Sequence, residues 1–366
     1  MGGVVGKGDI VVNTTNDGVP IDQLWSEFEE ANQLYNVHKT SIAGLLSYRT
    51  VLPAEYIAQS LTAEQMDEAT EFGVPRGMAP PPKYAKLGFT FHDFDKATRI
   101  SWRFLRGATA EQVRSVATRV FEADTNKLQE LVFGRLFSNV PTANDFQHTV
   151  YSLWNGDGMV PPSFMGKAFD GTHTHYLVSG GATIDSQDVE LAINHVTEHG
   201  YGITPGSQLV LLVNPAESEH VQSWRAGQEN ANTQEARWDF VPSSNAPAWI
   251  SAENIHGAIP PPDFHGLKVL GSYGKAWVIE SYVIPQGYFA VVATGGLNSA
   301  DNPLALREHE KPEWRGLKLV PGPWARYPLV ESFFMRGIGV GTRHRGAAVV
   351  VQCKASGSYD VPTIVL

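Results

Sequence analysis

The sequence contains one short match to a catalytic signature. His195-Val196-Thr197-Glu198-His199 has the pattern H-x-x-E-H, which in inverted zinc proteases places two histidine ligands one helical turn apart beside a glutamate base. The segment is predicted to be helical, but His195 and His199 flank Asp188 on the polar border of that helix, where an ordinary amphipathic helix also carries polar residues. A third ligand would have to be a downstream acid such as Glu253 or Glu280. Since nothing singles one out, a zinc hydrolase is only an alternative.

Other candidate sites are weaker. Thr172-His173-Thr174-His175-Tyr176 places two histidines on one face of an extended segment, a geometry that can bind metal but more often supplies hydrogen bonds. The glycines of Gly337-Ile338-Gly339-Val340-Gly341 lack the helix that a dinucleotide loop needs, and a strand at close backbone approach is the simpler interpretation. No serine elbow occurs, and Cys353 lies in a predicted strand. We predict no catalytic residue, no cofactor and no metal site.

Composition narrows the class of protein. The chain has 366 residues, is 42% hydrophobic and carries a net charge of −10, so an ordinary DNA-binding module is disfavoured. A single cysteine excludes an internal disulfide and zinc sites that need two or more cysteines. No apolar run reaches the roughly 18 residues of a membrane span, and the first residues do not resemble a signal peptide. We expect a protein that matures in a reducing cytoplasm without membrane contact.

The charges are segregated along the chain. Residues 76–136 contain eleven Lys and Arg against six Asp and Glu, whereas residues 170–263 contain twelve Asp and Glu against only Arg225 and Arg237. Two solvated surfaces of opposite sign would explain this pattern. The alternative is that the basic segment of one copy lies on the acidic face of its neighbour.

Periodicity predicts a mixed α+β chain. A Gly- and Val-rich arm (residues 1–18) precedes a helix that Asp22 caps and that runs to about Leu46, and a Pro-rich hinge covers residues 73–83. Residues 84–105 are predicted to form a two-stranded loop with its polar tip at 92–96. Thr109 then caps a long helix to Phe137. The later elements are a helix over 185–199 closed by Gly200, a buried strand over 209–213, a helix opened by Asn214-Pro215, strands over 267–272, 277–284 and 288–294 with Pro285-Gln286-Gly287 turning the last pair, and an antiparallel pair formed by 333–340 and 347–352.

This order resembles the major capsid protein of tailed bacteriophages, the Hong Kong 97-type capsid fold. Local strings also look like head proteins of actinobacterial phages, namely Trp154-Asn155-Gly156-Asp157-Gly158-Met159 with Pro161-Pro162, Thr172-His173-Thr174-His175-Tyr176 and Phe334-Met335-Arg336-Gly337-Ile338-Gly339-Val340. The resemblance covers nearly the whole chain and implies a structural protein, not an enzyme.

The resemblance also implies a domain plan. It comprises an N-terminal arm and helix (1–75), an extended loop (76–108), a spine helix with the first part of a peripheral domain (109–175), an apical domain (176–301) and a return to the peripheral domain (302–366). The basic, aromatic loop would lie across an adjacent subunit, and acidic apical domains would meet around each capsomer centre. The residues expected at contacts between subunits are Lys83, Lys86, Phe89, Phe91, Phe94, Lys96, Arg99, Trp102 and Arg103.

Partners follow from the same resemblance. The chain is expected to assemble with itself into the pentamers and hexamers of an icosahedral head in the bacterial host cytoplasm, around non-specifically held double-stranded DNA. A portal, a separate scaffolding protein and a decoration protein are further expected partners. An encapsulin-type nanocompartment, which packages enzymes, is the alternative. Some related shells join a loop lysine to a peripheral asparagine, but no Asn follows Asn302, so we predict no such crosslink. A chain that begins at Met1 is expected to lack a cleaved scaffolding segment.

Overall fold

The computed structural model describes residues 12–37, 42–58, 84–244, 259–321 and 329–366, with the single residues Glu68 and Val74. The chain divides into two compact units, each built from separate segments. Unit 1 contains the described residues of Met1–Lys39, His92–Lys127 and Glu308–Ile338. Unit 2 contains those of Thr40–Phe91, Leu128–Arg307 and Gly339–Leu366. No helix within the described residues is both long enough and apolar enough to cross a membrane.

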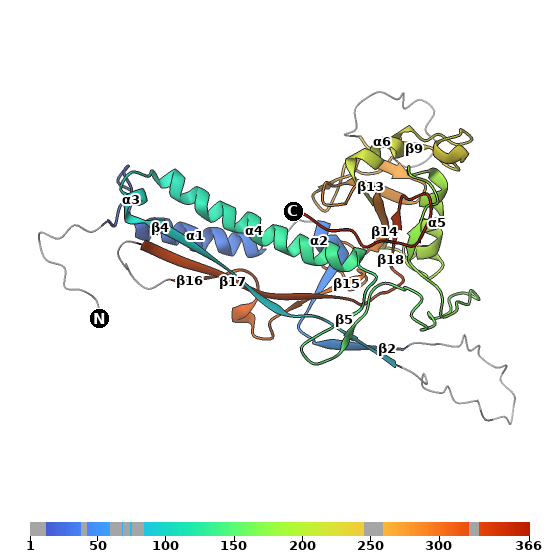
Figure 1. Cartoon of the computed structure of the whole chain (residues 1–366), viewed down its shortest axis with the longest axis horizontal. Helices are drawn as coiled ribbons and strands as arrows, with labels where there is room; N and C mark the ends of the chain where they lie inside the picture. Colours follow the sequence, from blue (N-terminus) through green and yellow to red (C-terminus); the bar gives the residue numbers. More distant parts are fainter. Residues whose placement is uncertain are drawn as a thin grey trace, which may run out of the picture. The chain divides into compact units, whose positions relative to one another are not determined.

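Unit 1 consists of helices packed beside a narrow sheet (Figure 1). Strand β17 (Leu329–Thr342) pairs with β16 (Lys318–Pro321) and, in an antiparallel ladder of ten residue pairs, with β4 (His92–Ser101). The remaining elements are α1 (Ile21–Val37), α3 (Trp102–Leu105), the 3₁₀ turn η3 (Pro312–Trp314) and the first part of α4 (Ala110–Phe137). The predicted long helix is thus confirmed. Its first turn is capped by Thr109, whose Oγ1 accepts from the Gln112 amide at 3.5 Å.

The buried apolar clusters described in unit 1 are small. Val120, Leu317 and Phe334 form one buried cluster, and Tyr35 of α1 stacks on Phe121 of α4 with ring centroids 4.9 Å apart. A second cluster gathers around Leu24 at the start of α1.

Unit 2 is organised around a seven-stranded sheet with the order β7-β18-β14-β8-β13-β12-β9. These strands are β7 (Tyr176–Val178), β8 (Gln208–Val213), β9 (Phe240–Pro242), β12 (Gly271–Tyr273), β13 (Ala276–Glu280), β14 (Tyr288–Thr294) and β18 (Ala348–Gln352). The other elements are α2 (Ile42–Leu46), α5 (Ser186–Thr197), α6 (Pro215–Ser223), the 3₁₀ turn η1 (Ala231–Thr233), and strands β1 (Ser47–Thr50), β2 (Ala54–Ala58), β3 (Tyr84–Gly88), β5 (Thr142–Ala143), β6 (Thr149–Val150), β10 (Asp263–Phe264), β11 (Leu267–Lys268) and β15 (Leu304–Glu308).

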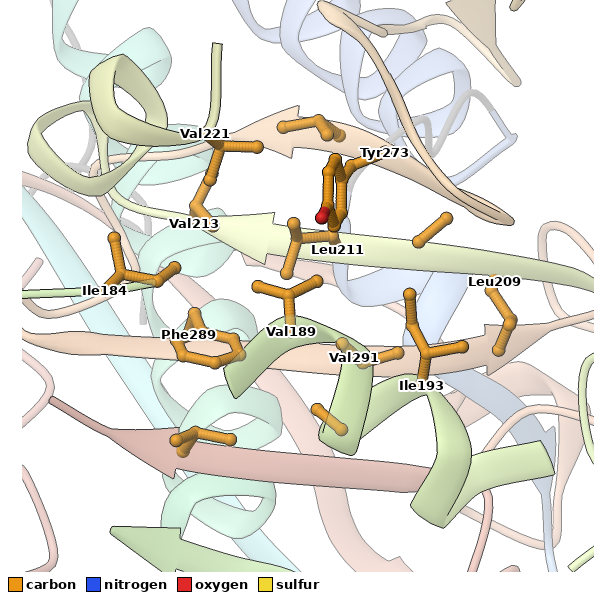
Figure 2. Packing of buried hydrophobic residues seen from close by; sticks show 14 of the residues in the cluster. Ile184, Val189, Ile193, Leu209, Leu211, Val213, Val221, Tyr273, Phe289 and Val291 are labelled. Carbon is orange, nitrogen blue, oxygen red and sulfur yellow. The ribbon is translucent and has the colours of Figure 1, made fainter. Parts of the chain in front are cut away.

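The core of unit 2 lies between this sheet and helix α5 (Figure 2). Val189 and Ile193 of α5 face the odd-numbered side chains of β8 and β14, which are fully buried: Leu209, Leu211, Val213, Phe289, Val291. The even-numbered Val210 and Leu212 of β8 are buried as well, so both faces of this strand are covered, as its unbroken apolar sequence predicts. The predicted helix, central strand and Asn-Pro helix are confirmed, with Asp185 and Asn214 as the two N-caps.

Three predicted strand pairings are wrong. The segment 84–105 is not a hairpin, because β3 pairs with β2 while β4 pairs with β17 and includes the supposed tip at 92–96. Strands β13 and β14 do not pair, since β8 lies between them. Strand β18 pairs with β14 and β7, and not with β17. Each error joined strands close in sequence, whereas these sheets draw their neighbours from distant segments.

Candidate assembly surface and a histidine cluster

Strand β4 is a long edge of the unit 1 sheet. Its ten residues pair with β17 on one side, and the described part of the chain places no strand on its other side. An unpaired strand edge offers backbone donors and acceptors to another chain. Lys96 and Arg99 are exposed along this edge, and Arg103 is exposed on α3 directly after it. Asp93 and Asp95 near the start of the strand are exposed as well, so the positive charge lies from Lys96 onward and on α3.

Several of the predicted contact residues already have partners in their own chain. The Nε of Arg99 lies 3.0 Å from a carboxylate oxygen of Glu331, its cross-strand neighbour. The Nζ of Lys127 lies 4.9 Å from the ring centroid of Phe94. In unit 2, Lys86 lies opposite Tyr56, with its Nζ 5.3 Å from the ring centroid. These are exposed or half-buried interactions, each worth less than about 1 kcal/mol, so they leave the side chains free to rearrange.

The remaining predicted contact residues divide into three groups. Phe89 is fully buried within its own chain, against Tyr48 and Ala305. Trp102 is half-buried, and Phe91 is half-buried with the guanidinium carbon of Arg307 at 5.1 Å from its ring centroid. Lys83 lies outside the described residues. The alternation of apolar and polar residues along the sequence could not predict that Phe89 is buried in its own chain. The residues that cover it, Tyr48 and Ala305, are about 40 and 215 residues away.

The string from Trp154 to Met159 wraps around one buried arginine. The Nη2 of Arg345 donates to Asp157 Oδ2 at 2.6 Å, and its Nε donates to the Ser152 carbonyl at 2.9 Å. Its guanidinium carbon lies 4.1 Å from the ring centroid of Trp154. Sequence reasoning placed Arg345 in a turn and missed this role, because its partners lie about 190 residues away.

Comparison with known proteins identifies the family of this chain. No protein-family model matches the sequence, and no curated protein does. Among solved structures, one of Mycobacterium phage Patience is 38% identical, with 99% of this chain and 96% of that chain covered and a TM-score of 0.73. This chain belongs to the tailed-phage major capsid proteins. The capsid of the cyanophage P-SCSP1u is 9% identical to this chain, with 87% of this chain and 90% of that chain covered and a TM-score of 0.47. An encapsulin complex from Synechococcus elongatus is 11% identical, with 91% of this chain and 97% of that chain covered and a TM-score of 0.45.

Membership in this family fixes the coarse role of the chain. It is a structural subunit of a phage capsid, located in the virion and assembled from copies of itself. The fold class predicted from the sequence is also confirmed.

The capsid chain also brings together histidines from two separate segments. His173 and His175 precede strand β7, and His199 follows the C-terminal end of α5. Their three Nε2 atoms form a nearly equilateral triangle, with separations of 3.0 Å (173 to 175), 2.9 Å (173 to 199) and 3.0 Å (175 to 199). His175 is fully buried, and the other two are half-buried. The sequence suggested each half of this cluster separately and could not join them.

The H-x-x-E-H pattern does not form the site that its name suggests. His195 stays outside the triangle: its Nδ1 lies 3.0 Å from the Leu191 carbonyl, and its ring is stacked 5.7 Å from that of His173. Glu198, the supposed general base, forms an ion pair with Lys167 at 3.3 Å. Glu280 is not among the three clustered ligands, and Glu253 lies outside the described residues. The zinc-hydrolase arrangement is therefore not assembled.

Burial keeps the clustered histidines neutral at neutral pH. Desolvation lowers the pKa of His199 to about 3, with a further contribution from the nearby His173 and His195. Desolvation also lowers the pKa of His173, and that of His175 falls well below its usual value. Three uncharged imidazoles consequently direct their Nε2 atoms at one point, which is the ligand form that transition metals bind.

Proposed function

We propose that this chain is the subunit that self-assembles into the hexamers and pentamers of an icosahedral phage head enclosing double-stranded DNA, and that it has no enzymatic activity. The observation that carries the proposal is the 38% identity to the Mycobacterium phage Patience structure over 99% of the chain. Such identity over the full length supports a shared role, whereas fold alone does not determine function.

The alternative is an encapsulin-type nanocompartment shell. It would use the same fold but enclose enzymes in place of a genome. The contents of particles purified from the host distinguish the two functions. We expect nuclease-protected double-stranded DNA inside shells built from this chain. Shells that hold a defined protein cargo and no DNA would instead identify a nanocompartment.

We further propose that the β4 edge is an assembly surface. Lys96 and Arg103 are exposed at this edge and at its end. Charge of the opposite sign lies on unit 2, where Glu219 of α6 and the following Glu229 and Glu235 are exposed. Attraction between exposed charges falls steeply beyond a Debye length of about 8 Å at physiological salt. Contact between a β4 edge and an acidic neighbour would therefore make assembly depend on ionic strength.

A double charge reversal tests this surface. Lys96→Glu with Arg103→Glu reverses two positive charges at the β4 edge and at its end, and Lys275→Glu changes an exposed lysine of unit 2 as a control. We expect the double variant to fold with the wild-type circular dichroism spectrum but to yield at least tenfold fewer particles in negative-stain micrographs. The control variant should assemble normally. Wild-type particle yield in the double variant, or capsomers indifferent to salt, would contradict the proposal.

The remaining partners are also proposals. A portal, a separate scaffolding protein and a decoration protein fit the role of a phage head, as does assembly in the host cytoplasm. The shell is expected to hold together without isopeptide bonds, because no Asn follows Asn302 in the sequence. Boiled virions on a denaturing gel should therefore show a monomer band, and a ladder of covalent multimers would contradict this expectation.

A further inference from the structure

The triangle formed by His173, His175 and His199 cannot be closed by hydrogen bonds alone. A ring nitrogen either carries a proton and donates, or carries a lone pair and accepts. Around three mutually close Nε2 atoms, at least two must therefore be alike. Every assignment of protons leaves one pair, separated by 2.9 to 3.0 Å, in which two N–H groups or two lone pairs face each other. Such contacts are unfavourable in a half-buried to buried site.

The proton on His175 can be placed from its other nitrogen. Its Nδ1 lies 2.6 Å from the carbonyl oxygen of Ala348 in β18. A carbonyl only accepts, so Nδ1 carries the proton and the neutral ring directs an Nε2 lone pair into the triangle. A histidine that binds a metal through one nitrogen and donates from the other to a backbone carbonyl is the usual arrangement around metal sites. His175 has that arrangement while being fully buried.

Packing contacts also hold the ring of His199 in its orientation toward the triangle. The ring of Phe169 stacks on that of His199, with centroids 4.0 Å apart and planes inclined by 12°. Gly346 lies against the other part of the side chain, because a Cβ at position 346 would come within 2.9 Å of His199 Cγ. A side chain packed by a ring and by a glycine is held before any ligand arrives, which lowers the entropic cost of binding.

We propose that His173, His175 and His199 bind a divalent transition-metal ion of the zinc class through their Nε2 atoms. Zinc bonds to histidine nitrogen are about 2.0–2.1 Å long, which puts tetrahedral ligands about 3.3 Å apart. The observed 2.9 to 3.0 Å edges need only a few tenths of an ångström of expansion. Neutral imidazole suits zinc and its neighbours in the first transition row, and not calcium or magnesium. One ion accepts all three lone pairs, which no set of protons achieves.

The ion would be structural. It would join the segment before β7 to the end of α5, and it would reach β18 through the hydrogen bond from His175 to Ala348. All three elements belong to unit 2. Bound metal stabilises the folded state by mass action, because the unfolded chain does not hold three histidines together.

Metal content of the full-length protein tests the proposal. The wild type, purified without chelator, incubated with excess Zn²⁺ and dialysed, should retain about one zinc per chain by mass spectrometry of the metal. His199→Ala and His173→Gln should each lower the retained zinc about tenfold or more. His195→Ala is the matched control, because His195 lies one turn earlier, is equally half-buried and stays outside the triangle.

A second measurement covers variants that fold poorly. Chelator treatment of the wild type should lower its melting temperature, and added Zn²⁺ should restore it. Cobalt replacement should give the visible absorption of a four-coordinate site in the wild type and in His195→Ala. A wild type that retains under a tenth of a zinc per chain and melts identically with chelator would overturn the proposal, as would stoichiometric zinc that survives both His199→Ala and His173→Gln.

Discussion

Two buried arginines, Arg345 in unit 2 and Arg336 in unit 1, are compensated in different ways. In unit 2, the guanidinium of Arg345 has backbone carbonyls, Asn155 and Asp157 as acceptors. In unit 1, Arg336 lies 2.6 Å from Asp124, but its N–H groups do not point well enough at the carboxylate or at any other acceptor in the described residues to form hydrogen bonds. A buried guanidinium that depends on one carboxylate is fragile, whereas one with several acceptors is not.

The apolar cores differ in the same direction. Among the described residues, unit 2 buries twenty in a single cluster around its sheet, while two buried clusters of unit 1 have three and five members. Unit 1 also carries the long open edge of β4. We infer that unit 2 is stable by its own packing, and that unit 1 gains more of its stability from neighbouring subunits.

The largest expected effect is a difference in unfolding free energy between variants at the carboxylate partners of the two buried arginines. Asp124→Asn leaves Arg336 without its compensating charge and should cost about 3 to 5 kcal/mol in unfolding free energy. Asp157→Asn leaves Arg345 with its carbonyl acceptors and should cost about 1 kcal/mol. Urea denaturation of dissociated subunits measures both. Equal costs would show that the number of acceptors does not set the stability of these charges.

A matched pair of leucines compares the cores. Leu211 of β8 and Leu317 of unit 1 are both buried, but Leu211 belongs to the twenty-residue cluster and Leu317 to the three-residue one. We expect Leu211→Ala to cost about 4 kcal/mol and Leu317→Ala about 2 kcal/mol, because a large rigid core collapses less around a cavity. The exposed Leu191 and Leu34 serve as controls for each unit. A larger cost in unit 1 would reverse the comparison.

A smaller effect concerns the pH dependence of unit 2. Burial and the adjacent Asp185 raise the pKa of Asp188 from its usual 3.8 to about 7. Between about pH 4 and pH 7, the folded chain therefore keeps a proton on the Asp188 carboxyl, whereas the unfolded chain has lost it. The stabilisation of the folded state that comes from binding this proton is fully present below about pH 4 and is lost as the pH rises to about 7.

Asp188→Asn removes this pH dependence. An asparagine can still accept the capping hydrogen bond that Asp185 donates from its amide. We expect the variant to be more stable than the wild type by about 2 kcal/mol at pH 8 and equally stable near pH 4. Urea denaturation across this range checks the prediction, with the exposed Asp263→Asn as the control. A constant difference at every pH would contradict the assigned cause.

The sequence determined the local elements of this protein. Helical periodicity and capping residues located α4 and α5, and the unbroken apolar run located the buried strand β8. Order and local strings together indicated the capsid family. The helical signals are local because the hydrogen bonds of a helix join residues near in sequence, and the apolar run that marked β8 lies within the strand itself.

Only the tertiary structure decided which distant segments meet. It removed the predicted hairpin at 84–105, buried Phe89 and gave Arg345 its partners. It also joined His173 and His175 to His199, while leaving His195 outside. Two short histidine patterns, each weak alone, became one cluster because the start of β7 and the end of α5 lie together in unit 2. Such meetings depend on strand order, which the spacing of residues along the chain does not encode.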